Sequence, residues 1–194
     1  MKRGFTLLEV MISVAIMVLV VGVMYLLADS MDLASRTQEA QTTTLDNARM
    51  GMWFLVRELR GAGDNSFTNV FPGGTVTYRK ATDLDGNGTP VDSGGNLELG
   101  TPRTLQVDTA GRLVLIDGAT TRVITGGVAP NEDANGNGAL DAGEDANNSG
   151  RLERGLWFER DGTGIRITVE AQRNPGPRTP VMITTITETV VPRN

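Results

Sequence analysis

The 194-residue sequence contains neither cysteine nor histidine, and aromatic residues make up only 5% of it. Without cysteine, the chain cannot use disulfides for stability. Without histidine, it cannot hold a Ser-His-Asp or Cys-His catalytic group, and His-ligated zinc or haem sites are excluded too. Lysine is also scarce, since Lys2 and Lys80 are the only two. Carboxylates, hydroxyls and arginines are therefore the main groups left for chemistry.

The formal net charge is −5, and it is concentrated in one segment. Residues 131–153 hold one base, Arg151, and six acids, which are Glu132, Asp133, Asp141, Glu144, Asp145 and Glu153. This segment alone therefore carries −5, and the rest of the chain is neutral. A dense acidic segment favours a bound cation and disfavours nucleic acid, whose phosphates it repels.

A long apolar run near the N-terminus is the clearest pattern in the sequence. Residues 10–28 contain no charged side chain. As a helix rising about 1.5 Å per residue, they nearly span the hydrocarbon core of a bilayer. Because Lys2 and Arg3 precede the run, the positive-inside rule places the N-terminus in the cytoplasm and the bulk of the chain outside.

Three interpretations of this run treat its flanks differently. A cleaved secretory signal normally has a shorter apolar core and small residues before the cut, whereas the candidate here is Leu26-Leu27-Ala28. An uncleaved signal anchor explains the run but not Glu9, because an acid at the edge of an apolar span is unfavourable. The simplest account of Glu9 alone is that an acid in the first helical turn interacts well with the helix dipole.

The third interpretation accounts for the whole string Gly4-Phe5-Thr6-Leu7-Leu8-Glu9-Val10. This string resembles the type III signal of type IV pilins and type II secretion pseudopilins. The resemblance implies that a prepilin peptidase cuts between Gly4 and Phe5 and methylates the new amino group of Phe5. It also implies that Glu9 faces the N-terminal ammonium of a neighbouring subunit during assembly. Such a pairing is physically reasonable, because a buried acid is tolerated when a cation meets it.

The same resemblance implies the partners and the location of the chain. The expected partners are other pilin subunits, the prepilin peptidase and an inner-membrane assembly platform. The precursor is expected to cross the inner membrane once, with a cytoplasmic N-terminus, before it enters a periplasmic or extracellular filament.

The helical pattern continues beyond residue 28. Apolar residues recur in steps of three and four, which mark one helix face: Leu45, Ala48, Met52, Leu55, Val56 and Leu59. The remaining surface is expected to hold the charged residues Asp46, Arg49, Arg57, Glu58 and Arg60. Gly61-Ala62-Gly63 predicts that the helix ends at Arg60. A helix from Phe5 to Arg60 would be about 80 Å long.

After residue 63 the sequence changes to short runs rich in Thr, Val and Ile, separated by turn residues. These runs predict strands at 75–80, 104–108, 112–116, 121–125, 156–160, 165–170 and 181–191. Hairpin turns are predicted at 109–111, 117–118 and 161–164. The predicted fold is therefore α+β, with an antiparallel sheet packed on the distal half of the long helix, as in type IV pilins.

The predicted organisation has four parts. A leader peptide covers residues 1–4, a hydrophobic transmembrane or filament-core helix covers 5–28, an amphipathic continuation covers 29–62, and a β-rich domain covers 63–194. The Thr-rich tail from Ile183 to Asn194 resembles the last strand of PilW-type minor pilins and J-type pseudopilins. The length of the chain and its lack of cysteine also favour a minor component over a small major pilin.

An insert at residues 131–156 contains a calcium-loop pattern. Residues 133–144 follow the twelve-residue EF-hand loop position by position. The predicted ligands are Asp133, Asn135, Asn137, the carbonyl of Ala139, Asp141 and Glu144, and Gly138 makes the sharp turn. This spacing is suitable because calcium takes six to eight oxygen ligands. The alternative is an Asn/Asp/Gly-rich surface turn without a metal.

Two degenerate copies of the pattern are also present. The second starts at once, with the predicted ligands Asp145, Asn147, Ser149, the carbonyl of Arg151 and Glu153. Its twelfth residue is Leu156, so this loop would be weaker or would borrow a ligand from elsewhere. The third begins with Asp83, Asp85 and Asn87, but Pro90 follows and no acid closes the pattern. The tandem is similar to the calcium repeats of dockerins and thrombospondin type 3 modules.

These observations favour a structural function, as a minor pilin that initiates, caps or decorates a filament. A pseudopilin of type II secretion is the alternative within the same family. An adhesin or a DNA-uptake pilin is a second class, but without Lys2 and Arg3 the chain has 16 bases against 23 acids, which disfavours nucleic acid. An anchored glycosidase with paired carboxylates is disfavoured, because the acids lie mostly in the insert and aromatics for binding sugar are few. No enzyme activity is expected.

Overall fold

The structure is a computed structural model that describes residues 6–63, 66–68, 71–176 and 179–192. The chain forms two compact units, residues 1–39 and residues 40–194. Lys2, Arg3, Gly4 and Phe5 lie outside the described residues, as do the last two residues of the tail.

Helix α1 runs from Leu7 to Arg60 and contributes to both units. Its start is capped by Thr6, whose Oγ1 accepts a hydrogen bond of 3.3 Å from the backbone N–H of Glu9. Its end is where the glycine pair predicted it, with the N–H of Gly61 bonded to the carbonyl of Glu58 at 3.2 Å. In the second unit, helix residues become buried from Ala40 onward.

All seven predicted strands are present, and they form two antiparallel sheets where one was expected. The four-stranded sheet has the order β1-β2-β3-β4 and the three-stranded sheet the order β5-β6-β7. Their bounds are β1 Val76–Ala81, β2 Leu99–Val107, β3 Leu113–Asp117, β4 Thr120–Thr125, β5 Leu156–Asp161, β6 Gly164–Arg173 and β7 Met182–Val190. Neighbouring strands are joined in chain order. The long insert after β4 separates the two groups of strands along the chain.

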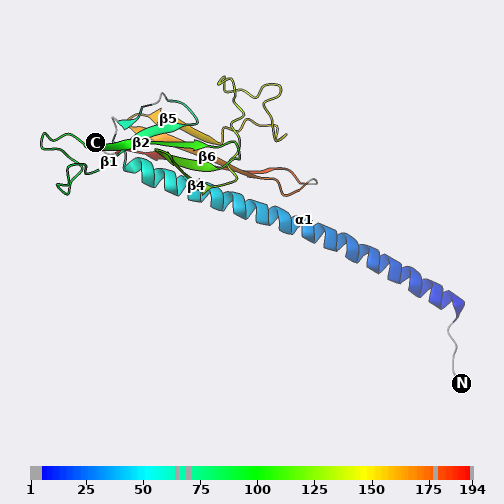
Figure 1. The fold of residues 1–194 in the computed structure, drawn as a ribbon. Helices are drawn as coiled ribbons and strands as arrows, with labels where there is room; N and C mark the ends of the chain where they lie inside the picture. Colours follow the sequence, from blue (N-terminus) through cyan, green and yellow to red (C-terminus); the bar gives the residue numbers. More distant parts are fainter. Residues whose placement is uncertain (1–5, 64–65, 69–70, 177–178, 193–194) are drawn as a thin grey trace. The chain divides into compact units, whose positions relative to one another are not determined.

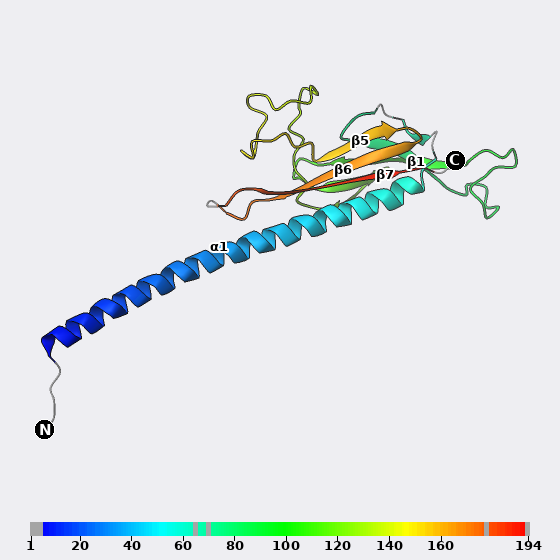
Figure 2. The same ribbon diagram turned by 180° about the vertical axis from the view of Figure 1, so that it is seen from behind.

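One hydrophobic core joins both sheets to the second part of α1. Figures 1 and 2 show this part of the helix running alongside the strands. The predicted helix stripe is confirmed at its centre, because Ala48, Leu55 and Leu59 are completely buried. Gly51 allows close approach of the four-stranded sheet, since a Cβ there would lie 3.3 Å from the methyl group of Thr125. The core therefore depends on a small residue that apolar periodicity alone did not identify.

Glu58 was predicted on the exposed side of the helix, and that prediction is wrong. Its side chain is only 5% exposed. The carboxylate lies 2.9 Å from Nη1 of Arg103 and 3.4 Å from Nζ of Lys80. Burial raises the pKa of Glu58, but Lys80 and Arg103 outweigh it and hold the pKa below its usual value. Strands β1 and β2 thus supply cations that make a buried acid acceptable.

Both ends of the insert are hydrogen-bonded to one residue of β6, Glu170. The N–H of Ala129 donates to the carbonyl of Glu170 at 2.7 Å, and the N–H of Glu170 donates to the carbonyl of Gly155 at 2.6 Å. The Glu170 carboxylate also accepts from the N–H of Arg154 at 2.7 Å. Both ends of the insert are therefore fixed beside the same strand, while the loops between them extend away from the sheets (olive in Figure 1).

Candidate functional site

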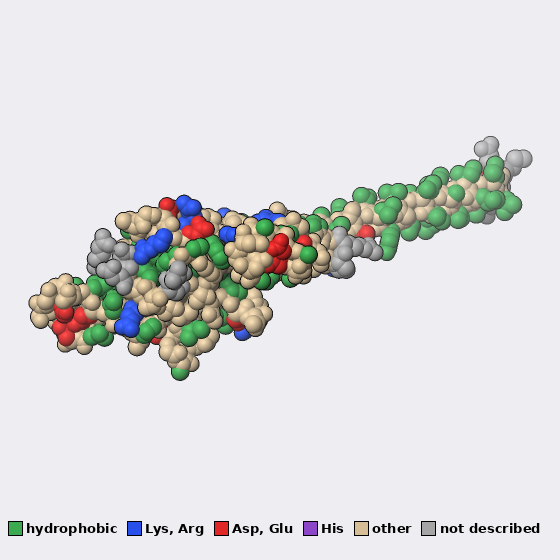
Figure 3. Space-filling view, turned by 90° about the horizontal axis from the view of Figure 1, so that it is seen from above, with side chains coloured by type: hydrophobic (Ala, Val, Ile, Leu, Met, Phe, Trp, Pro, Cys, Tyr) green, Lys and Arg blue, Asp and Glu red, His purple; other side chains and the backbone are tan. Residues whose placement is uncertain are grey.

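The first unit presents an uncovered apolar helix surface. Its large apolar side chains between Leu7 and Met31 are exposed, and green side chains cover this part of the helix in Figure 3. By length and composition, α1 is the one described helix that could cross a membrane. Glu9 lies in its first turn, and its side chain is exposed. The predicted cut between Gly4 and Phe5 lies just before this helix, outside the described residues.

In the second unit, the acid-rich loops form candidate cation sites. Loop A denotes residues 133–144, loop B residues 145–156 and loop C residues 83–98. Two red clusters in Figure 3 lie over the long loops that Figure 1 draws in green at the left and in olive. Each loop has the same three hydrogen bonds from a backbone N–H to a side chain. The N–H of the sixth loop residue donates to the side chain of the first residue, the N–H of the fifth donates to the side chain of the third, and the N–H of the seventh donates to the side chain of the fifth.

In loop A, hydrogen bonds connect the predicted ligands within the loop, but its three acids are not gathered as closely as those of loop C. Among the described residues, the three acids whose carboxylate oxygens lie within 4.8 Å of one another are Asp83, Asp85 and Glu98. The N–H of Gly138 lies 3.2 Å from both oxygens of Asp133, and Gly138 has the positive φ of 76° that its sharp turn requires. The amides of Asn135 and Asn137 each donate to Oδ2 of Asp141 at 2.7 Å. The oxygen types match those that calcium prefers.

Glu144 closes loop A through its two carboxylate oxygens. Oε1 accepts from the N–H of Ala134, the second loop residue, at 3.2 Å, and Oε2 accepts from the N–H of Asp141, the ninth, at 3.0 Å. A cationic group already lies nearby, since Nη2 of Arg154 is 3.0 Å from Oδ2 of Asp133. Arg154 neutralises part of the loop's charge and would have to share Asp133 with a metal ion.

Loop B has a closing acid that the sequence pattern did not reveal. Oε1 of Glu132 accepts from the N–H of Ala146, the second residue, at 3.0 Å, and Oε2 accepts from the N–H of Glu153, the ninth, at 3.2 Å. Glu144 accepts hydrogen bonds from the same two loop positions in loop A. Leu156, at the twelfth position, is buried at the start of β5. The sequence predicted that loop B would borrow a ligand from elsewhere. Glu132, which precedes loop A in the chain, occupies the position that such a ligand would take.

The remaining side chains of loop B surround Glu153. Ser149 Oγ donates to Oε1 of Glu153 at 2.8 Å, and Asn147 Nδ2 donates to Oε2 at 3.1 Å. Asp145 accepts the N–H groups of Ser149 and Gly150 at 2.8 and 3.0 Å. Arg151 also approaches Glu153, with Nε 3.4 Å from Oε1.

Glu132 and Glu153 form a buried pair of acids. Their exposed fractions are 3% and 0%. Burial is the largest cause and the neighbouring Glu153 the next, and together they raise the pKa of Glu132 to about 7. Two like charges in one buried place are unfavourable unless a proton or a cation compensates them. Arg151, which lies beside Glu153, compensates part of this charge.

Loop C also has a closing acid, contrary to the prediction. Oε2 of Glu98 accepts from the N–H of Leu84, the second loop residue, at 2.6 Å. Carboxylate oxygens of Asp83, Asp85 and Glu98 lie within 4.8 Å of one another. Asn87 is in place as well, because its Oδ1 accepts from the N–H of Thr89 at 2.8 Å. The sequence pattern missed Glu98 because this acid lies beyond the twelfth position, where the pattern expects the closing residue and the chain has Gly94.

Comparison with known proteins identifies the N-terminal region. Residues 1–25 match the family described as the prokaryotic N-terminal methylation motif. Over 65 residues, the chain is 46% identical to the pilin-like protein PilA3 of Thermus thermophilus. The chain is type IV pilin-like. The match covers 32% of this chain and 27% of the relative, so the chain spans about a quarter of the curated relative that it matches. No solved structure matches it.

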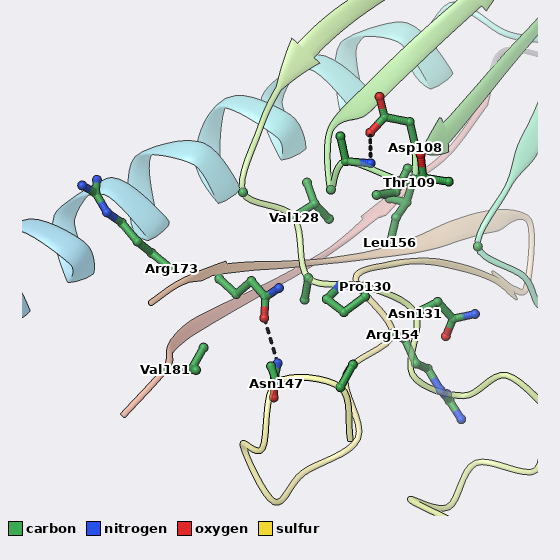
Figure 4. A pocket seen from close by; sticks show the side chains of 18 of the residues that line it. Asp108, Thr109, Val128, Pro130, Asn131, Asn147, Arg154, Leu156, Arg173 and Val181 are labelled. Carbon is green, nitrogen blue, oxygen red and sulfur yellow. Dashed lines mark hydrogen bonds between the residues drawn. The ribbon is translucent and has the colours of Figure 1, made fainter. Parts of the chain in front are cut away.

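Next to loop B, the type IV pilin-like chain has an open groove with a volume of about 1000 Å³ (Figure 4). Asn147 connects the loop to this groove, because its Nδ2 donates both to Glu153 and, at 2.8 Å, to Oε1 of Gln172 on β6. Asn131, Arg154 and Arg173 add polar groups to the lining. An ion held in loop B would therefore also fix one wall of the groove.

Proposed function

We propose that this type IV pilin-like chain is a minor subunit, similar to PilW-type minor pilins, of a type IV pilus-like filament. The observation that carries the proposal is an uncovered apolar helix that begins within residues 1–25, the part of the chain that matches the methylation motif. Such a surface is unfavourable in water and must be covered by lipid or by other apolar helices. The precursor stage provides the lipid, and the filament provides neighbouring helices.

Processing follows from the same segment. The prepilin peptidase cuts between Gly4 and Phe5 and methylates Phe5, and the assembly platform of the inner membrane receives the mature subunit. Glu9 then pairs with the N-terminal ammonium of a neighbouring subunit. Because Glu9 lies among exposed apolar side chains, burial in the filament would be costly without that partner. The filament is periplasmic or extracellular.

Mass spectrometry of the mature N-terminus tests the proposal. An N-methylated Phe5 is expected, and a chain with Gly4→Leu, which alters the residue before the cut, should keep its leader. An N-terminus near residue 29 would instead indicate a cleaved secretory signal and would overturn the proposal.

A pseudopilin of type II secretion is the second candidate, since the same signal and fold plan serve both systems. Deletion of the gene separates the two. Loss of surface filaments with normal protein secretion supports the minor pilin. Retained filaments with secreted enzymes trapped in the periplasm support the pseudopilin.

The second part of the proposal is that the β-rich unit binds calcium in loops A, B and C. It is supported by oxygen-rich side chains in the EF-hand order and by a closing glutamate in each loop, namely Glu144, Glu132 and Glu98. Calcium would cancel the repulsion within each loop and couple binding to local folding. Extracellular calcium modules have dissociation constants of roughly 10⁻⁴ to 10⁻³ M, so a calcium-rich exterior would fill such loops.

Calorimetric titration of the full chain in detergent micelles tests this part. Binding should saturate, and Glu144→Gln, Glu132→Gln and Glu98→Gln should each remove one site. The matched control is Glu188→Gln, which changes the same charge on the exposed face of β7. An identical isotherm for all four variants would exclude the loops as the calcium sites.

A further inference from the structure

A hollow lies between the last turns of α1 and the outer strand of the four-stranded sheet. Its volume is about 310 Å³. Phe54 and Leu115 provide apolar walls, and the guanidinium groups of Arg57, Arg103 and Arg122 line the rest together with two acids. The hollow shares no lining residue with loops A, B and C and plays no part in the filament proposal.

The two acids in this hollow are already neutralised. Nη1 of Arg103 lies 2.9 Å from Oε1 of Glu58, and Nη2 lies 2.8 Å from Oδ2 of Asp117. Lys80 adds a further positive charge beside Glu58, at 3.4 Å. Arg103 is therefore fully engaged inside the protein, and its contacts explain why these acids tolerate their position.

Arg57 and Arg122 differ from Arg103 in having no internal acid. Neither forms an ion pair with any residue of the described ranges, and both are exposed. Arg122 extends from β4, which ends its sheet, and Arg57 from the neighbouring face of α1. Two uncompensated guanidinium groups thus line one hollow in a chain whose net charge is −5.

Trp53 lies one helical turn before Arg57 and is 63% exposed. The guanidinium carbon of Arg57 lies 4.5 Å from the centre of the indole ring, a cation–π contact. This contact orders the arginine before any partner arrives, which reduces the entropy lost on binding. Exposed Trp and Arg are also the residue types that contribute most to binding at protein interfaces.

We propose that the Trp53–Arg57–Arg122 surface binds an acidic segment of a partner protein, with one Asp or Glu carboxylate entering the hollow. The carboxylate accepts hydrogen bonds from Arg57 and Arg122, whose planar groups suit this geometry. The aliphatic stem of the same side chain packs against Phe54 and Leu115, and Trp53 covers the adjacent residue of the partner. Charge complementarity thus selects the occupant, and the volume limits it to about one side chain.

A nucleic acid fits this surface less well. Binding of a phosphate backbone requires a series of cations, because each contact neutralises one phosphate. Among the described residues, only two guanidinium groups of the hollow are without an acid partner, and the acids Glu58 and Asp117 line the same hollow. The hollow also receives a side chain rather than a strand.

The test uses Trp53 as its own reporter. The chain has two tryptophans, so Trp157→Phe leaves Trp53 as the only one. This full chain, in nonionic detergent at low salt, is titrated with poly-L-glutamate while tryptophan emission is recorded. A saturable change in emission is expected. Adding Arg57→Glu and Arg122→Glu should weaken binding by about tenfold or more, since these residues form the centre of the contact.

Two matched controls accompany the titration. Arg79→Glu reverses an exposed arginine on β1, the opposite outer strand of the same sheet, and should leave the affinity unchanged. Trp53→Phe leaves Trp157 as the reporter, which is stacked by Arg154 at 4.6 Å in a comparable way, and should show no saturable change. If charge reversal disturbs folding, the pair Arg57→Gln and Arg122→Gln serves the same purpose without added negative charge.

The results decide between the occupants. No change in Trp53 emission, or equal weakening by Arg79→Glu, overturns the proposal. A DNA duplex that binds more tightly than poly-L-glutamate, with the same dependence on Arg57 and Arg122, also overturns it and assigns the surface to nucleic acid.

Discussion

Replacing Glu132 by Gln tests loop B most sharply, because two opposite effects on stability are expected. The substitution should stabilise the metal-free chain and should remove the stabilisation by calcium. In the background Glu144→Gln and Glu98→Gln, only loop B retains its closing acid. Between pH 4.5 and about 7, the folded chain holds a proton on Glu132 that the unfolded chain has lost. The metal-free fold therefore loses stability as the pH rises through that window, and the full penalty is present at pH 8.

The size of the effect follows from the raised pKa. A rise from about 4.5 to about 7 corresponds to a penalty of about 3 kcal/mol at pH 8. Gln removes that penalty, but its single carbonyl oxygen cannot accept both N–H bonds that Glu132 accepts, which costs about 1 kcal/mol. Without calcium at pH 8, Glu132→Gln should therefore raise stability by about 2 kcal/mol, or the midpoint by roughly 4–8 °C. At pH 4, the gain should vanish.

Calcium should cancel the stability difference between the two chains. With Glu132 present, 2 mM calcium and a dissociation constant of about 10⁻⁴ M stabilise the fold by about 2 kcal/mol. In the Glu132→Gln chain, no such gain is expected. The assay is thermal denaturation followed by circular dichroism at both pH values, with EDTA or calcium, and Glu188→Gln serves as the charge-matched control. A lower midpoint for Glu132→Gln in EDTA at pH 8, or an undiminished calcium gain, would refute the reasoning.

Three further predictions concern the fold. Leu55→Ala, at a completely buried helix position, should cost about 3 kcal/mol in chemical denaturation, whereas Met50→Ala, at a position 54% exposed, should change stability by less than about 0.5 kcal/mol. Glu58→Gln should lower the free energy of unfolding by about 2 kcal/mol at pH 7. Because the pKa of Glu58 is lowered in the folded chain, this difference in stability from the parent chain should shrink as the pH falls below 4.5. A difference that stays constant with pH would contradict the assigned ion pairs. Gly155→Ala should destabilise the fold far more than Gly162→Ala. Both residues have φ near 60°, but only at Gly155 would the new Cβ collide with the carbonyl of Ala129. Equal midpoints of the two variants in thermal melts would exclude that collision.

The regular elements could be predicted because their signals are local. The apolar steps from Ala48 to Leu59 and the glycine pair after Arg60 fixed the helix to within a residue at its end. Strands were located by alternating apolar residues between turns. Glu58 could not be assigned, because its burial depends on Lys80 and Arg103, which approach it only in the folded sheet.

The candidate loops show the same limit in another form. A twelve-residue pattern finds Glu144, because that acid lies inside its own loop. Glu132 closes a loop that begins thirteen residues later, and Glu98 is separated from Leu84 by fourteen positions. Spacing cannot identify such acids. The available signal was weaker: Glu98 follows a pattern that lacks its own closing residue, and Glu132 is an acid of the insert to which neither pattern gives a role.

The attachment of the insert to Glu170 has a consequence for protein engineering. Since Ala129 and Gly155 both bond to this one residue of β6, their chain ends lie close enough to be joined by a short turn. Excising the intervening residues should leave the sheets intact, and an unrelated peptide of similar length should be accepted in their place. The strand thus offers an exchangeable display position on the β-rich unit, where the surface chemistry of the subunit can be changed without rebuilding its core.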